Sequence, residues 1–208
     1  MSDLIVIGTG GLAREVTDWI SSTHKIIGYS SITAEEHSAF GLPGQLFGVN
    51  IVPSDVGTDQ ALVAIGDPGV RRRVYAKLQA AGFSLPSFVH PSASVSRKAI
   101  LGPGVIVGAQ SAVSPNVEIG LLAHVNFCVG IGHDAHIGDF VQLNPGVQVG
   151  GGAQIGDGTT IGSGATVLHG TKIGENAIVA SGAVVFSRVP AGATMMGNPA
   201  KRLRIFDK

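Results

Sequence analysis

The chain has 208 residues, of which 31 are glycine, about twice the share of roughly 7% typical of soluble domains. Charged residues make up only 13%, and Lys plus Arg equals Asp plus Glu at 14 each, so the formal net charge is zero. Neutrality argues against a general nucleic-acid binder. An apolar share of 44% excludes a disordered chain.

Strands and helices alternate along the N-terminal part, which we assign to residues 1–85 as a βαβαβ domain of Rossmann-like type. Short apolar runs predict buried strands at 4–8, 25–29 and 61–65, and helices are expected at 12–22 and 68–81. Gly and Pro are frequent in residues 31–60, so we expect a loop there with one short strand near 49–52.

A glycine-rich turn follows the first strand. The spacing Gly8-x-Gly10-x-x-Ala13 is a weak form of the dinucleotide fingerprint. The second strand ends in Ser30-Ser31 instead of the acidic residue that would hold a ribose, which disfavours NAD. The turn either holds a phosphate at a helix N-terminus or only makes a tight bend.

A period of six residues runs through the second half. Every sixth residue from Val89 to Val185 is Val, Ile or Leu, which gives seventeen positions without a break. The residue four places after each, up to Val189, is Ala, Val, Ser or Thr. This is the signature of a parallel β-helix built from hexapeptides, which we assign to residues 86–190.

Three hexapeptides make one triangular coil, so residues 18 apart stack about 4.8 Å from each other. Each aliphatic residue points inward, the small residue fits an inner corner, and Gly or Asn is expected to supply positive φ. Residues 191–208 are expected to form a C-terminal cap, because a solenoid needs covered ends.

The two halves together resemble one family, the sugar acetyltransferases of PglD/NeuD type. These include sialic-acid O-acetyltransferases and N-acetyltransferases of nucleotide-linked amino-deoxy sugars. The motifs that carry the likeness are Ile-Gly-Thr-Gly-Gly (7–11), Ala-Ile-Gly-Asp (64–67) with Arg71 and Tyr75, His-Pro-Ser-Ala (90–93), Gly-His-Asp-Ala-His-Ile-Gly-Asp-Phe (132–140) and Gly-Asn-Pro-Ala-Lys (197–201). The resemblance implies a left-handed coil, a homotrimer with active sites between subunits, and acetyl-CoA as donor.

A His-Asp pair stands out in the charge-poor solenoid. His133 lies two residues past the inward Ile131, so it should point outward, and Asp134 could hold its Nδ1–H. Gly151 is 18 residues further on and should sit one coil above His133. The resemblance implies that His133 is the general base, that Asp134 orients it and that the Gly151 amide stabilises the oxyanion. Alternatively, Gly150-Gly151-Gly152 is merely a corner.

Other positions are expected to contact the two substrates. The resemblance and the 18-residue stacking assign acetyl-CoA to Asn126, Gln142, Ser163, His169, Ser181 and Lys201. Three of these residues have a plainer explanation. Asn126 could simply occupy a left-handed corner, Ser181 could be a routine repeat residue, and Lys201 could belong to a solvated tail. The nucleotide-linked sugar is assigned to Gly8, Thr9, Gly10, Gly11, Leu12, Ser30, Ser31, Gly66 and Asp67. Uridine-binding relatives usually have acidic residues at 30–31 and often a histidine at 12, so this chain departs from them.

The leading hypothesis is N-acetylation of a nucleotide-linked amino-deoxy sugar in glycan or polysaccharide biosynthesis, with no metal. O-acetylation of sialic acid or a related sugar would use the same residues. Remote alternatives are a hexapeptide carbonic anhydrase, with zinc held by histidines such as His133 and His136, and a non-catalytic scaffold.

We expect a cytoplasmic protein with neither nucleic-acid nor membrane partners. No apolar run approaches the ~18–20 residues of a spanning helix. The start Met1-Ser2-Asp3 lacks a basic signal-peptide region, and the single Cys128 cannot form an internal disulfide.

Overall fold

The structure, a computed structural model, describes residues 2–203. The chain divides into two compact units that meet between Phe88 and Val89, and each is described by itself.

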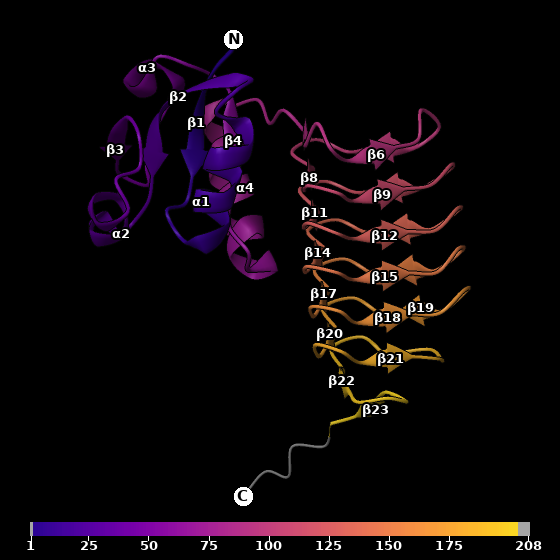
Figure 1. Cartoon of the computed structure of the whole chain (residues 1–208). Coiled ribbons are helices and arrows are strands. Elements are labelled where there is room, and N and C mark those ends of the chain that lie inside the picture. The colour runs from indigo at the N-terminus through magenta and orange to yellow at the C-terminus, as the bar shows by residue number, and fades with distance from the viewer. Residues whose placement is uncertain (1, 204–208) are drawn as a thin grey trace, which may run out of the picture. The chain divides into compact units, whose positions relative to one another are not determined.

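The first unit is a parallel sheet with four helices among the described residues (Figure 1). Its elements are β1 (Ser2–Ile7), α1 (Gly11–Ile20), β2 (His24–Ser30), α2 (Ala34–Ala39), β3 (Gln45–Phe47), α3 (Pro53–Val56), β4 (Ala61–Val63) and α4 (Pro68–Ala81). The strand order is β3-β2-β1-β4, and every pair is parallel. The carboxyl ends of β1, β2 and β4 therefore lie at one edge of the sheet.

The two long helices follow the sequence signals that predict them. In α1 the buried residues Ala13, Val16 and Ile20 recur at helical spacing, which gives one apolar face. In α4 the Asp67 side chain accepts a hydrogen bond from the Val70 N–H, and Pro68 occupies the first turn. Gly82 ends this helix with a left-handed φ of 86°.

The prediction for residues 31–60 is wrong in detail. The short strand is β3, at Gln45–Phe47, not at 49–52, and the segment also contains α2 and α3. Both helices are short, at six and four residues. Helices of that length have too few turns for a hydrophobic periodicity to indicate them in the sequence.

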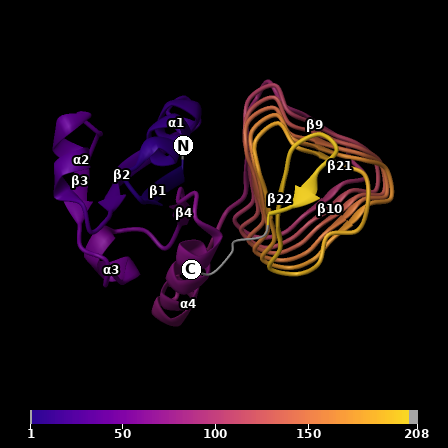
Figure 2. The ribbon, with the colours of Figure 1, turned by 90° about the horizontal axis from the view of Figure 1, so that it is seen from below.

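The second unit is the predicted left-handed parallel β-helix, seen end-on as a triangle in Figure 2. One face consists of β7 (Ile100–Leu101), β10 (Glu118–Ile119), β13 (His136–Ile137), β16 (Gln154–Ile155) and β19 (Lys172–Ile173). A second consists of β5 (Phe88–Val89), β8 (Ile106–Val107), β11 (His124–Val125), β14 (Gln142–Leu143), β17 (Thr160–Ile161), β20 (Ile178–Val179), β22 (Thr194–Met196) and β23 (Lys201–Arg202). The third consists of β6 (Ser94–Val95), β9 (Ala112–Val113), β12 (Gly130–Ile131), β15 (Gln148–Val149), β18 (Thr166–Val167) and β21 (Val184–Val185).

Each of the seventeen predicted aliphatic positions ends a two-residue strand, and partners 18 residues apart pair in register, as Ile119 does with Ile137. The columns of aliphatic and small residues form one core along the axis. The first coil is the exception, because Val89 is exposed and Val95 and Leu101 are only partly buried. No preceding coil covers their outer side.

The corners are built differently from the prediction. Positive φ recurs every six residues from Gly104 to Gly182, three places after the inward aliphatic, and half of these corners use a non-glycine residue such as Leu122 or Phe140. The frequent glycine one place after the aliphatic has another cause. A Cβ on Gly132 would lie 2.5 Å from a backbone nitrogen of the next coil, and Gly150 and Gly162 are similar. Glycine there permits close stacking of coils.

The last coil is two residues shorter than the others. Ile173 pairs with Val189 and Ile178 pairs with Thr194, so the offset is 16 instead of 18. Val189 therefore continues the aliphatic column, which corrects its assignment to the small column. Strand β22 extends the β-helix beyond residue 190, and β23 turns back antiparallel to it. The predicted cap beyond residue 203 lies outside the described residues.

Candidate active site

His133 and Asp134 lie at the corner between β12 and β13, with both side chains exposed. The His133 Nδ1 is 2.7 Å from Asp134 Oδ2. A carboxylate can only accept, so Nδ1 carries the proton and Nε2 is left as the basic nitrogen. The pair is therefore arranged as a general base and the residue that orients it.

Asn116 is a functional candidate that the sequence analysis missed. Its Nδ2 donates to Asp134 Oδ1 over 2.9 Å, so each carboxylate oxygen of Asp134 has a donor. The hydrogen bond from Asn116, and after it the one from His133, lowers the pKa of Asp134. The carboxylate is thus held charged and in place beside the imidazole. The signal was available, because 116 is one 18-residue coil before 134.

Gly151 stacks directly over the His133 ring. A Cβ at this position would lie 2.8 Å from Nε2 and 2.9 Å from Cε1 of His133. Among the described residues, none accepts a hydrogen bond from the Gly151 N–H. The glycine therefore gives the basic nitrogen its space and offers an amide donor beside it.

His169 lies at the same corner, one coil beyond Gly151 and two coils beyond His133. Its ring centroid is 6.2 Å from that of His133, and the rings are tilted by 48°. One corner of a single chain thus brings together His133, Asp134, Gly151 and His169. Asn116 lies one coil before Asp134 and contacts its carboxylate.

The remaining predicted acetyl-CoA residues lie elsewhere on the prism. Asn126, Ser163 and Ser181 follow strands β11, β17 and β20, so they occupy the corner between the second and third faces. Gln142 is on β14 and Lys201 on β23, both on the second face. The strands of the third face separate these residues from His133 within one chain.

Asn126 does not have the left-handed backbone that was the alternative explanation for it. The backbone φ of Asn126 is not positive, and its Oδ1 accepts a hydrogen bond from the Phe127 N–H over 2.7 Å. The bare-corner interpretation is therefore wrong for Asn126, and its role toward acetyl-CoA stays a prediction.

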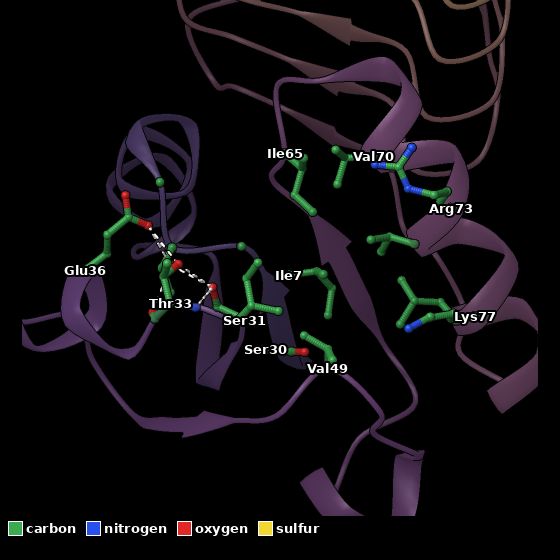
Figure 3. A pocket seen from close by; sticks show the side chains of 16 residues that line it. Ile7, Ser30, Ser31, Thr33, Glu36, Val49, Ile65, Val70, Arg73 and Lys77 are labelled. Carbon is green, nitrogen blue, oxygen red and sulfur yellow. Dashed lines mark hydrogen bonds between the residues drawn. The ribbon is translucent and has the colours of Figure 1, made fainter.

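The first unit contains a cavity of about 460 Å³ at the carboxyl edge of its sheet (Figure 3). Five predicted substrate residues line it: Gly8, Thr9, Gly10, Ser30 and Ser31. The Ser30 hydroxyl is occupied within the domain, because it donates to the Gly48 carbonyl over 2.8 Å. The edge formed by parallel strands and the N-terminus of α1 is where open α/β sheets bind ligands.

Four other predicted substrate residues, Gly11, Leu12, Gly66 and Asp67, are not among those that line the cavity. Asp67 caps α4. The Gly66 carbonyl accepts from the buried Arg71 over 2.8 Å, as does that of Ile65 over 2.7 Å. Burial lowers the pKa of Arg71 to about 10, and Asp67 opposes that shift, so the guanidinium stays charged at neutral pH and fixes the loop after β4.

Three charged residues of the cavity were missed by the sequence analysis. Glu36 from α2 lies on one wall, and Arg73 and Lys77 from α4 lie on the other, as Figure 3 shows. Apolar residues such as Ile7 and Ile65 lie between them. The one-helix-turn spacing of Arg73 and Lys77 places two cations on one face of a predicted helix, which was a usable signal. Glu36 gave none, because α2 was not predicted.

Two family models match the chain. The PglD N-terminal domain matches residues 3–78, and the bacterial transferase hexapeptide (six repeats) matches residues 134–169 and 152–187. The solved structure of a single-residue mutant of perosamine N-acetyltransferase from Caulobacter crescentus, in complex with CoA and GDP-perosamine, is 30% identical to this chain with a TM-score of 0.86. The match covers 98% of this chain and 97% of that one. This chain belongs to the PglD-like sugar acetyltransferases. It is an acyltransferase of the hexapeptide class.

Other solved structures are similar over nearly the whole acetyltransferase. The acetyltransferase domain of PglB from Neisseria gonorrhoeae, in complex with acetyl coenzyme A, is 30% identical with a TM-score of 0.71, and the match covers 97% of this chain and 98% of that one. WeeI from Acinetobacter baumannii is 24% identical with a TM-score of 0.80, and the match covers 98% of this chain and 100% of that one. At this identity the match supports the shared fold but not a shared function. Among curated proteins, no significant match is found.

Residues 2–203 contain no set of three or more His, Cys, Asp or Glu side chains that could hold a metal ion. In the same part of the acetyltransferase, no helix has the length and apolarity needed to cross a membrane.

Proposed function

We propose that this acetyltransferase moves the acetyl group of acetyl-CoA to the amino group of a nucleotide-linked amino-deoxy sugar used in glycan assembly. The observation that carries the proposal is the His133 ring, held by Asp134 and stacked on Gly151. The complexes of similar enzymes with CoA, acetyl coenzyme A and GDP-perosamine support the two substrates.

The chemistry follows from the corner geometry. His133 Nε2 takes a proton from the sugar amine as its nitrogen attacks the thioester carbonyl carbon. The Gly151 N–H donates to the oxygen that becomes negative. The carbon–sulfur bond then breaks, and the His133 imidazolium returns its proton to the departing thiolate. Asp134 stabilises the imidazolium, and Asn116 keeps that carboxylate charged.

Most of the residues assigned to acetyl-CoA lie away from His133 within one chain, and this supports the expected homotrimer. The His133 corner and the corner with Asn126, Ser163 and Ser181 are separated by the third face. In a trimer, the first corner of one copy faces the second corner or second face of the next. The acetyl-CoA site is then completed between two subunits, with His133 and His169 on one side of the cleft and the other assigned residues on the opposite side.

Subunit complementation tests the shared site. His133→Ala and Asn126→Ala alter different sides of the proposed cleft, so each variant should be impaired alone. Co-assembled at random in equal amounts, the two variants should restore roughly a quarter of wild-type activity. Half of the interfaces receive an intact His133 side, half receive an intact opposite side, and only interfaces with both intact sides are active. Sedimentation would verify the trimer. Failure of mixed trimers to gain activity would place all these residues in one subunit's site.

The function itself is tested by release of CoA thiol with a panel of nucleotide-linked sugars. Amino-deoxy sugars should be turned over, and His133→Ala should lower kcat/KM by at least about 10²-fold. Turnover of hydroxy sugars alone would overturn N-acetylation and indicate O-acetylation. Near-full kcat/KM in His133→Ala would overturn the base assignment.

A further inference from the structure

Four oxygen-bearing side chains form a tight cluster on one wall of the cavity. The Thr9 hydroxyl donates to Glu36 Oε2 over 2.9 Å and lies 2.9 Å from Ser31 Oγ and 3.1 Å from Thr33 Oγ1. Thr33 Oγ1 also lies within hydrogen-bond distance of Glu36 Oε2, at 3.2 Å. Figure 3 shows Ser31, Thr33 and Glu36 converging, away from Arg73 and Lys77.

This cluster, formed by Thr9, Ser31, Thr33 and Glu36, has more acceptors than donors. Its three hydroxyls supply three hydrogens, whereas each hydroxyl oxygen has two lone pairs and a carboxylate accepts about four hydrogen bonds. Among the described residues, no group donates to Glu36 Oε1. A ligand that suits this wall therefore brings hydroxyl or N–H donors, and two adjacent donors suit a carboxylate best.

The position of the cluster indicates which donors. Thr9 lies between Gly8 and Gly10 in the turn that precedes α1, and Ser31 follows β2 directly. In sheets of this kind an acidic residue after the second strand accepts from a ribose hydroxyl. Positions 30 and 31, where the sequence predicts that acidic residue, are both serine. Here α2 folds back and brings Glu36 to the same turn, hydrogen-bonded to Thr9.

The opposite wall fits the rest of a nucleotide. Arg73 and Lys77 offer two cations for a diphosphate, and Ile65 and Val70 offer apolar surface for the face of a base. The cavity is thus polar at both sides with opposite charge, and apolar between them.

We propose that Glu36, oriented by Thr9 and Thr33, accepts hydrogen bonds from the 2′- and 3′-hydroxyls of the nucleotide's ribose. Glu36 then selects ribonucleotides over 2′-deoxyribonucleotides. The inference rests on the proposed function for the presence of a nucleotide in this cavity. It assigns the ribose, not the base, to the carboxylate.

The test is calorimetric titration of the full chain with GDP, 2′-deoxy-GDP, UDP and 2′-deoxy-UDP. The wild type should bind each ribonucleotide at least about tenfold more tightly than its deoxy form, the effect of losing a hydrogen bond to a charged group. In Glu36→Ala that preference should fall to within about twofold. Glu35→Ala is the matched control, since Glu35 is exposed on the same helix and does not line the cavity, and it should keep the wild-type preference.

The outcomes separate this inference from the proposed function. Equal binding of ribo and deoxy forms by the wild type, or an unchanged preference in Glu36→Ala, overturns the role of Glu36 alone. A change in the GDP-to-UDP ratio without a change in the ribo-to-deoxy ratio means that Glu36 contacts the base, which also overturns it. If none of the four nucleotides binds, a substrate linked to a guanine or uracil nucleotide is overturned together with the role of Glu36. Matching thermal unfolding of the three proteins shows that α2 and its domain are intact.

Discussion

Replacing Gly151 with Ala adds one methyl group at the point where the site is tightest. The new Cβ would lie 2.8 Å from His133 Nε2, 2.9 Å from Cε1 and 3.1 Å from Cδ2. Its backbone φ lies outside the left-handed region, so alanine fits the backbone without strain. The three nearest heavy atoms all belong to the exposed His133 ring, which can swing away. Stability should therefore fall by less than about 1 kcal/mol.

The catalytic effect should be much larger. Ordinary contact needs roughly 3.4 Å, so the His133 ring must withdraw by at least about 0.6 Å from its place beside Gly151. A misplacement near 1 Å can cost about 10²-fold in rate, so we expect kcat/KM to fall by roughly 10- to 100-fold. The hydrogen bond to Asp134, at 2.7 Å, restrains the direction in which the ring can move.

A double-mutant cycle isolates the mechanism. If Gly151→Ala acts by displacing the ring, it should cost little further activity in a His133→Ala background, whereas independent effects would multiply. Thiol release measures kcat/KM, and urea unfolding at fixed protein concentration measures stability. The reasoning is refuted if Gly151→Ala keeps activity within threefold of wild type, or if its loss is fully additive with His133→Ala.

Three further predictions concern single contacts. Asn116→Gly keeps a residue that tolerates the φ of 60° but removes the hydrogen bond that favours the charged form of Asp134. The pKa of Asp134 should therefore rise toward the ordinary aspartate value. A ¹³C titration of the Asp134 carboxyl carbon measures that pKa, and the absence of a rise would contradict the prediction. Arg71→Met leaves two carbonyls without their buried charged donor and should cost about 3 kcal/mol by urea unfolding, and a loss under about 1 kcal/mol would show that water replaces the guanidinium. Ile155→Ala should cost about 2–5 kcal/mol in the β-helix core, whereas the exposed Ile178→Ala should cost less than about 1 kcal/mol; similar losses would mean that the column does not form the core.

The repeat made the β-helix predictable from composition and spacing. A residue that points inward on one coil must be matched on the next, so the constraint recurs at every sixth position and is visible in one sequence. The same 18-residue offset placed Gly151 over His133 and could equally have placed Asn116 beside Asp134. The low charge of the chain follows as well, since a coil consists mostly of core and corner positions.

The N-terminal cavity was less accessible to sequence reasoning. Its glycine turn and the ends of β1 and β2 were found, because strand ends and turns have local signals. Helix α2 has six residues and no buried side chain among them, so no apolar pattern marks it. Glu36 reaches Thr9 from 27 residues away only because α2 folds back against the turn.

The sequence by itself determined the two-part architecture, because alternating strands and helices give way to a six-residue period. It also determined the register of the coils and the stacking of His133 on Gly151, since both follow from periodic burial. Tertiary structure alone decided which corner positions take positive φ, where the last coil loses two residues, and which charged side chains line the cavity. Those features depend on contacts between segments with no shared period, such as Glu36 with Thr9. Local sequence constrains the backbone at each segment, but packing decides which side chains meet.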